Sequence, residues 1–256
     1  MTTSHSSPPV ALSACKLTYR YPKMTVPILD GLDLSLNEGE VFGLLGPNGA
    51  GKTTAISILS TLRKPDTGTL FLKGMDPVRN LRDIRRMIGL VPQDIALYSE
   101  LTARENLRFF GKLAGLGGAL LKHRIEAALA AVGLESRANE RIETFSGGMK
   151  RRANLAAGIL HEPQVLFLDE PTVGIDAQSR QLIMDRIRVL QAQGTTVLYT
   201  THYMEEAQQI CSRVAIMDQG RILAQGTVNE LRFACPGCEN LGELFLRLTG
   251  KTLRDG

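Results

Sequence analysis

Positions 46–54 hold the residues whose chemistry is most readily recognised, and they read Gly-Pro-Asn-Gly-Ala-Gly-Lys-Thr-Thr. They match G-x-x-x-x-G-K-[ST], a pattern in which backbone N–H groups of a glycine-rich loop surround phosphate oxygens. Lys52 can reach the β- and γ-phosphates of a nucleotide, and Thr53 can ligate Mg²⁺. We therefore predict that the chain binds a nucleoside triphosphate through this phosphate loop, which comprises Gly46, Pro47, Asn48, Gly49, Ala50, Gly51, Lys52, Thr53 and Thr54.

The segments on either side of the phosphate loop have the patterns that the motif requires. Residues 40–45 form a short apolar run that is typical of a buried strand, and residues 55–62 have the pattern of a helix. A helix that begins at the loop adds partial positive charge where the phosphates would bind. The strand–loop–helix context therefore favours a phosphate-binding loop over an ordinary glycine-rich turn.

A second apolar strand, predicted at residues 165–168, ends in two carboxylates, Asp169 and Glu170. A buried parallel strand brings its last residues to the carboxyl edge of the sheet, where the phosphate loop also lies. We therefore expect Asp169 to hold Mg²⁺ through water and Glu170 to accept a proton from an attacking water molecule. Without the phosphate loop, a charged strand end that faces solvent would explain these two residues equally well.

Ser146, Gly147 and Gly148 lie just before a helical run at residues 150–160. Serine suits the N-cap of a helix, and the paired glycines leave the helix N-terminus uncovered, so that it could bind an anion. The chain has one phosphate loop, so we interpret this second anion site as binding the nucleotide of another copy. Taken alone, these residues would be better explained as an ordinary capped helix.

Length and composition are those of an ordinary globular protein. The chain has 256 residues, of which 43% are hydrophobic and 22% charged, and its net charge of +4 is too small to indicate nucleic-acid binding. No run approaches the roughly 18 apolar residues of a membrane span. Residues 1–9 are rich in Ser, Thr and Pro, which favours a disordered lead-in over a signal peptide. These features predict a cytoplasmic protein.

The four cysteines do not predict a disulfide framework in a chain of this length. Cys235 and Cys238 have the CxxC spacing, but zinc would need a second ligand pair, and neither Cys15 nor Cys211 supplies one. A redox pair is expected at the start of a helix after a strand, whereas this pair lies in a C-terminal turn. We interpret Cys235 and Cys238 as two inert surface thiols.

The remaining pattern predicts a mixed α/β core with an inserted helical subdomain near residues 94–160. In that subdomain one helix face is predicted to carry Leu107, Phe110, Leu113 and Ala114, and another Ile125, Leu129 and Val132. Antiparallel strands are predicted in residues 10–36. Further strands are predicted at residues 69–73, 88–91, 196–199 and 214–217, a helix at 177–191, and two short amphipathic segments in the tail at 227–248.

Taken together, these motifs resemble those of the nucleotide-binding subunits of ATP-binding cassette (ABC) transporters. The phosphate loop resembles the Walker A motif of that family, and residues 165–170 resemble its Walker B motif. Residues 145–149 resemble the family signature, and residues 173–176 resemble the D-loop. Six ordered motifs over about residues 10–250 carry the resemblance.

The resemblance implies roles for residues that have no clear signal of their own. It identifies His202 as the switch histidine that contacts the γ-phosphate and acts with Glu170 in catalysis, and Gln93 as the Q-loop glutamine at the nucleotide and its Mg²⁺. It also implies a nucleotide contact by Asp176 of the D-loop. Tyr21 lies where the family has an aromatic residue that stacks on adenine, with Tyr19 as the competing choice.

The implied fold is a P-loop NTPase core of the α/β class, with an antiparallel β subdomain and an inserted helical subdomain. Residues 10–226 would form the nucleotide-binding domain and residues 227–256 a short C-terminal helical tail. The signature departs from the usual pattern in its outer positions, where Phe145 and Met149 replace Leu and Gln. Ser146, Gly147 and Gly148, which make the phosphate contact in the family, are intact.

The resemblance also implies partners. Two copies would associate head to tail as a homodimer, and each ATP, with Mg²⁺, would lie between the Walker A motif of one copy and the signature of the other. A separate membrane permease would hold the pair at the cytoplasmic face of the cell membrane, with its coupling helix near Gln93 and residues 94–115. The substrate would be handled by that permease.

Residues 170–180, 200–206 and 244–250 resemble ATPase subunits of daunorubicin-resistance-type exporters. An importer subunit is the nearer alternative, although many importer subunits carry longer C-terminal domains. A soluble ABC ATPase that acts on ribosomes or DNA is a further alternative. The span from the phosphate loop to the signature, however, lacks the sustained heptads of DNA-acting members. A kinase or GTPase would leave the signature and His202 unexplained.

Overall fold

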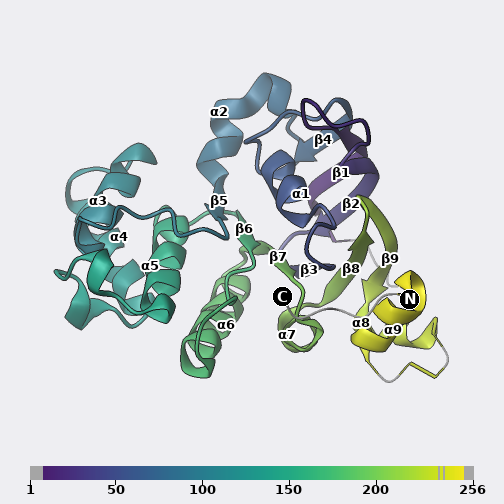
Figure 1. Ribbon diagram of the computed structural model, residues 1–256. Helices are drawn as coiled ribbons and strands as arrows, with labels where there is room; N and C mark the ends of the chain where they lie inside the picture. Colours follow the sequence, from purple (N-terminus) through teal and green to yellow (C-terminus); the bar gives the residue numbers. More distant parts are fainter. Residues whose placement is uncertain (1–7, 236, 239, 251–256) are drawn as a thin grey trace, which may run out of the picture.

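The computed structural model of the chain describes residues 8–235, 237–238 and 240–250 (Figure 1). Most of the segment predicted as a disordered lead-in, residues 1–7, lies outside this range. β1 (Val10–Tyr19) pairs antiparallel with β2 (Leu29–Asn37) and with β4 (Thr67–Leu72), and the three strands form one sheet. The antiparallel strands predicted in residues 10–36 are therefore confirmed.

A second sheet of six strands has the order β5-β6-β7-β3-β8-β9. Its members are β3 (Val41–Leu45), β5 (Ile88–Val91), β6 (Val165–Asp169), β7 (Thr196–Thr201), β8 (Arg213–Asp218) and β9 (Arg221–Thr227). Neighbouring strands are parallel except β8 and β9, which pair antiparallel. β9 was not among the predicted strands. Its side chains are half-buried or exposed, and its apolar run is limited to Ile222, Leu223 and Ala224.

Side chains of the central strands alternate between two hydrophobic cores. Phe42 of β3 and Phe167 of β6 pack with the three-stranded sheet and with α1 (Lys52–Leu59). Leu45 and Leu168 of the same strands pack on the opposite side, with the helices that cover that face. Because both faces of the parallel strands are buried, their sequences are continuous apolar runs.

Helices from the C-terminal half of the chain cover part of the second core, which also includes buried residues between positions 103 and 132. α6 (Ala177–Ala192) and α7 (Met204–Ile210) contribute Ile183, Ile187 and Ala207 to it. α8 (Val228–Phe233) and α9 (Leu241–Thr249) complete it with Leu231 and Leu244, so both tail segments predicted at residues 227–248 form helices. Among the described residues, no helix combines the length and the apolar character that a membrane span requires.

A group of three helices lies at one end of the molecule, away from the three-stranded sheet (Figure 1): α3 (Ala103–Leu113), α4 (Gly118–Ala131) and α5 (Gly147–Ile159). Ile125, Leu129 and Val132 are buried there. The face predicted on α3 differs, because Leu107 is buried but Leu113 is 75% exposed. α2 (Pro77–Met87), which joins β4 to β5, was not predicted; Ile84 is its only buried side chain.

The prediction for Cys235 and Cys238 as two surface thiols is wrong. The two residues form a disulfide in the turn between α8 and α9, and Cys235 is buried in the second core. Cys211 is also buried, which raises the pKa of its thiol, whereas Cys15 is exposed. The CxxC spacing itself gave no indication that the turn would fold inward against α9.

Two buried asparagines hold the loop that follows β5. Asn154 of α5 accepts a hydrogen bond from the N–H of Ala96 (3.2 Å) and donates one to the carbonyl of Pro92 (3.2 Å). Asn106 of α3 accepts from the N–H of Tyr98 (2.8 Å) and donates to the carbonyl of the same residue (3.0 Å). The loop carrying Gln93 is therefore fixed to the three-helix group by side-chain amides.

The asparagine at position 154 gives a first prediction. In Asn154→Ala the amide of Ala96 and the carbonyl of Pro92 lose their partner, so we expect the free energy of unfolding to fall by about 1–3 kcal/mol. Hydrogen exchange should accelerate at the amide of Ala96 and stay unchanged in β3. Unchanged exchange at Ala96 would contradict this account of how the loop is held.

Candidate nucleotide-binding site

The phosphate loop connects β3 to α1, as predicted. Gly51 is the N-cap residue of α1, and its φ of 104° places it in the left-handed region that favours glycine. No side chain caps this helix, so its first backbone N–H groups lack a side-chain acceptor. The loop therefore ends in a helix N-terminus suited to an anion.

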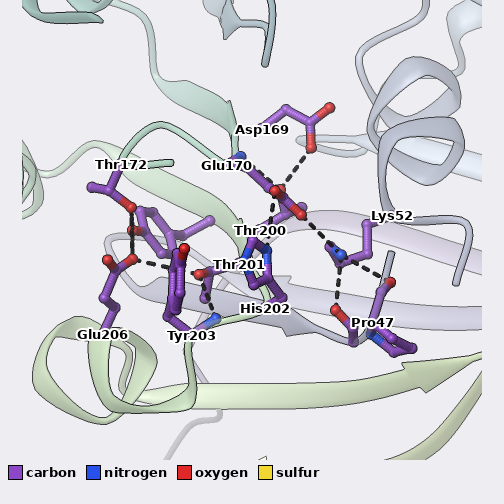
Figure 2. A network of polar contacts seen from close by, with 12 residues as sticks. Pro47, Lys52, Asp169, Glu170, Thr172, Thr200, Thr201, His202, Tyr203 and Glu206 are labelled. Carbon is purple, nitrogen blue, oxygen red and sulfur yellow. Dashed lines mark hydrogen bonds and ion pairs between the residues drawn. The ribbon is translucent and has the colours of Figure 1, made fainter. Parts of the chain in front are cut away.

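Lys52 is 5% exposed, and its ammonium group is turned toward the protein. Its Nζ atom donates hydrogen bonds to the carbonyls of Gly46 (2.8 Å) and Pro47 (3.1 Å) and lies 2.9 Å from Oε1 of Glu170 (Figure 2). Three oxygen atoms thus surround the cation that is predicted to bind nucleotide phosphates.

Asp169 is the last residue of β6 and is 2% exposed. Its Oδ1 atom accepts a hydrogen bond from the hydroxyl of Thr200 on β7 (2.7 Å). Burial raises the pKa of Asp169, and hydrogen bonds from Thr200 and Thr53 oppose that rise. The carboxylate of Asp169 therefore lies beside the hydroxyl of Thr53 in the phosphate loop.

Glu170 follows Asp169 with a left-handed backbone conformation (φ 46°) and a side chain that is almost fully buried. Its N–H donates to the hydroxyl of Thr200 (3.0 Å). Its Oε2 atom lies 3.2 Å from Nδ1 of His202, which follows β7, so the carboxylate sits between His202 and Lys52. The structure brings these three predicted residues into direct contact from three separate segments.

Gln93 lies outside this cluster, in the loop after β5. Its side chain is exposed, and its carbonyl accepts a hydrogen bond from the guanidinium group of Arg151 on α5. Thr53, Asp169 and Gln93 together offer a hydroxyl, a carboxylate and an amide oxygen. That donor set suits Mg²⁺, which commonly takes one or two protein ligands and completes its shell with water and phosphate oxygens.

The two tyrosines considered for adenine differ in exposure and in their contacts. Tyr19 is buried at 9% exposure and accepts a hydrogen bond from Arg63 (3.3 Å). Tyr21 is half-buried, its hydroxyl lies 3.2 Å from that of Thr54, and the guanidinium group of Arg63 lies 5.0 Å from its ring centroid. Tyr21 is thus the more exposed ring beside the phosphate loop.

The Ser146–Gly148 segment opens α5, as predicted, and is not in contact with the phosphate loop. Ser146 caps α5 by accepting from the N–H of Met149 (3.2 Å). Gly148 packs against the start of α6, where a Cβ atom on it would lie 2.2 Å from Oγ of Ser179 and 2.7 Å from Oδ2 of Asp176. Asp176 caps α6, and its hydrogen bonds with Ser179 lower its pKa. The signature segment and Asp176 therefore form one surface.

The sequence did not indicate the residues whose hydrogen bonds hold the predicted site residues in place. Thr200 joins Asp169 to Glu170 across β6 and β7, and Asn154 holds the loop of Gln93. Glu206 of α7 is 4% exposed and accepts hydrogen bonds from the segments around Glu170 and His202. A glutamate that directly follows another glutamate carries no signal of burial, whereas the threonines beside the strand ends could have suggested such contacts.

Comparison with known proteins gives a family match. The sequence profile of the family described as ABC transporter matches residues 29–173. The linearmycin resistance ATP-binding protein LnrL of Bacillus subtilis (strain 168) is 47% identical over 239 residues, which cover 93% of this chain and 74% of that protein. The Nod factor export ATP-binding protein I of Paraburkholderia xenovorans (strain LB400) is 43% identical over 238 residues, covering 93% and 77%.

Another similar sequence is the daunorubicin resistance ATP-binding protein DrrA3 of Streptomyces coeruleorubidus, 47% identical over 80% of this chain and 65% of that protein. Among solved structures, an ATP-binding subunit of an ABC transporter is 30% identical with a TM-score of 0.84, covering 93% of this chain and 99% of its own. A dimeric ATP-binding cassette in a post-hydrolysis state with ADP and Pi is 26% identical, with a TM-score of 0.78, covering 84% and 98%. These likenesses confirm the predicted fold.

The buried contact between Lys52 and Glu170 gives a second prediction. Lys52→Met leaves the Glu170 carboxylate without its closest cation, so we expect the nucleotide-free chain to lose about 3 kcal/mol of unfolding free energy. Adding Glu170→Gln should restore most of this loss, because the second change removes the uncompensated charge. Urea denaturation of both variants measures the effect, and a double variant no more stable than Lys52→Met would count against it.

Proposed function

Since this chain belongs to the ABC transporter family, as an ATP-hydrolysing subunit of the exporter type, we propose that it drives export through a separate membrane permease from the cytoplasmic face of the membrane. The observation that carries the proposal is the contact of Lys52, Glu170 and His202 at the phosphate loop. Relatives named for drug resistance and for Nod factor export support export. Nothing supports the importer or soluble alternatives.

ATP would bind with its phosphates at the loop of residues 46–54 and its adenine ring on Tyr21. Lys52 would turn from the carbonyls of Gly46 and Pro47, and from Glu170, toward the β- and γ-phosphates. The uncapped N-terminus of α1 would direct its N–H groups at the same phosphates. Nucleotide binding therefore exchanges one set of oxygen partners of Lys52 for another.

Thr53, Asp169 and Gln93 would hold Mg²⁺ at the phosphates, Thr53 directly and Asp169 through water. The ion, when bound, supplies positive charge to the phosphate oxygens. Gln93 would have to turn inward from the exposed loop after β5, so its contact would couple that loop to the occupied site. Asn154, which accepts from the N–H of Ala96 and donates to the carbonyl of Pro92, holds this loop to α5.

In hydrolysis Glu170 would accept a proton from water as the water oxygen bonds to the γ-phosphorus. The bond from that phosphorus to the bridging oxygen breaks, giving ADP and phosphate. Once Lys52 has moved to the phosphates, Oε1 of Glu170 is free of its ion pair and can act as the base. His202, 3.2 Å from the other carboxylate oxygen, would contact the γ-phosphate and orient Glu170.

The second half of each site would come from another copy of the chain. Ser146 and Gly147 are exposed at the start of α5, apart from the phosphate loop of their own chain. A head-to-tail, two-fold dimer would bring them to the γ-phosphate of the partner's ATP. The similar cassette solved with ADP and Pi is dimeric, which supports this arrangement.

The permease would dock beside the loop of Gln93. A hollow of about 260 Å³ lies there, lined by apolar residues that include Leu90, Ala96, Phe110 and Leu113. Leu113 is 75% exposed although its position in the pattern of α3 is apolar. A coupling helix seated in this hollow would cover that side chain and contact the loop that senses the nucleotide.

The assignment of the base gives a third prediction. Glu170→Gln keeps the size of the side chain but removes its basicity, so we expect ATP hydrolysis to fall by roughly 10²–10⁴-fold while ATP binding persists. The variant should accumulate as an ATP-bound dimer, which size-exclusion chromatography with ATP and Mg²⁺ would detect. Full turnover would assign the base to another residue, with His202 the first candidate.

The shared site gives a fourth prediction, for which position 147 is the suitable probe. Substitution of Gly148 would damage its own chain, because a Cβ atom there meets Ser179, whereas a Cβ atom on Gly147 meets nothing closer than 3.8 Å. An aspartate at position 147 also suits the first turn of a helix. In the dimer, Gly147→Asp should repel the γ-phosphate of the partner's ATP.

Lys52→Ala and Gly147→Asp chains should therefore be inactive alone and should partly recover ATPase activity when mixed. In the mixed dimer both defects fall in one composite site, and the other site has an intact phosphate loop and an intact signature. Phosphate release across mixing ratios measures the recovery. If Gly147→Asp alone hydrolyses ATP at the normal rate, the shared-site proposal is wrong.

A further inference from the structure

Glu206, on α7, is a buried carboxylate that the proposed mechanism does not use. It is 4% exposed, and its Oε2 atom accepts hydrogen bonds from the hydroxyls of Tyr199 (2.6 Å), Thr172 (2.7 Å) and Thr201 (3.4 Å). These donors come from two segments that meet at the site, the turn after β6 and the end of β7. One oxygen atom of Glu206 therefore accepts hydrogen bonds from three buried hydroxyl groups.

The other oxygen of Glu206 faces a cation. Nε of Arg180 lies 3.3 Å from Oε1, and neither atom has a hydrogen-bond partner among the described residues, so the two attract each other as an ion pair. The guanidinium group of Arg180 also lies 5.7 Å from the ring centroid of Tyr203. Arg180 is in the first turns of α6, the helix that Asp176 caps. Glu206 thus also contacts α6.

The contacts of Glu206 lie next to both proposed catalytic residues (Figure 2). Thr172 follows Glu170 by two positions and is fully buried. Thr201 directly precedes His202, and its hydroxyl accepts a hydrogen bond from the N–H of Tyr203 (2.9 Å), which closes the turn around the histidine. The carboxylate therefore joins the turn that bears His202 to the segment that leaves Glu170.

A carboxylate is expensive to bury, and only several donors together can offset its desolvation. The pKa of Tyr199 is raised well above its usual value by burial and by the charge of Glu206, so its hydroxyl stays protonated and donates. An apolar side chain at position 206 would pack in the same core but would remove the shared acceptor. Thr172 and Tyr199, whose hydroxyls are 3.0 Å apart, could then bond only to each other, and Arg180 would lose its ion pair. The carboxylate of Glu206 therefore fixes the orientations of the Thr172, Tyr199 and Thr201 side chains, which apolar packing alone would not fix.

We propose that Glu206 is a positioning residue for ATP hydrolysis, which holds the turn of His202 in register with the segment after Glu170 and so sets the contact between the two side chains. This role presupposes the proposed functions of Glu170 and His202. The polar contacts of Glu206 are with Thr172, Tyr199, Thr201 and Arg180, so it would act on Glu170 and His202 through their neighbours. Its effect is on the geometry of the pair, where Nδ1 of His202 lies 3.2 Å from Oε2 of Glu170.

The first test compares two adjacent glutamates of α7 in the full chain. Glu206→Gln keeps the shape but replaces one acceptor oxygen with a donor, so the contacts cannot all be made, and we expect kcat for ATP to fall on the order of tenfold with KM nearly unchanged. Glu205→Gln removes the same charge from an exposed position and should retain normal kcat. Equal kcat in the two variants would overturn the proposal.

A second pair of variants separates the hydroxyl contact from packing. Thr172→Val removes the donor to Glu206 with little change in volume, and Thr172→Ser keeps the hydroxyl. We expect a several-fold lower kcat in the first and near-normal kcat in the second, with ATP affinity unchanged in both. If Thr172→Val hydrolyses ATP as fast as Thr172→Ser, the network does not position the site. This comparison holds even if Glu206→Gln fails to fold.

The third test asks whether Glu206 acts through His202. In a His202→Ala background, Glu206→Gln should cause little further loss of kcat, because the contact that it sets is already absent. Losses that multiply would overturn the positioning role and indicate a general effect on folding. Normal kcat in His202→Ala alone would instead contradict the proposed function of His202, so the two failures are distinguishable.

Discussion

Hydrogen bonding between three parallel strands sets where the proposed catalytic groups meet. β3 pairs with β7 so that Leu45, the last residue before the phosphate loop, lies opposite Thr201, and β6 pairs with β7 so that Asp169 lies opposite Thr200. The three strands therefore end at one level, and the residues that follow them converge. A shift of one residue in the β6–β7 ladder would turn the Asp169 side chain to the opposite face of the sheet, and the same shift in the β3–β7 ladder would displace the start of the phosphate loop. The register of β7 is thus the constraint on which the site depends.

Because the sheet is covered on both faces, its strands could be predicted from apolar runs alone, and five of the six strands of the large sheet were. The motif residues at the ends of those strands were predictable for a related reason: residues 46–54 and residues 169–170 need particular side chains at particular places, so their spacing is informative. β9 was missed because its side chains are half-buried or exposed and its apolar run is only three residues long. The burial of Cys235 was not predicted, because the CxxC spacing does not indicate whether the turn packs against the core or faces solvent.

The supporting contacts were beyond sequence reasoning, for a physical reason. Asn154 lies far along the chain from Pro92 and Ala96, yet one amide side chain bonds to both. Glu206 looks like a surface glutamate beside Glu205 until the fold brings Thr172 and Arg180 to it. Such residues are recognised by the donors around them, which only the packed structure specifies. Leu113 illustrates the opposite error, an apolar position that the isolated chain leaves exposed.

The ion pair between Lys52 and Glu170 would have to break before either side chain could act in the proposed reaction. It joins the lysine that would receive the phosphates to the carboxylate that would activate water. While the two side chains are paired, neither is available for the role proposed for it. A polyphosphate that bound Lys52 would also free Oε1 of Glu170. Binding of the nucleotide would thereby make the base for its own hydrolysis available. Separating the pair lowers the affinity for every nucleotide by the same factor, so the attraction between the phosphates and Lys52 has to exceed that of the ion pair before the loop is occupied.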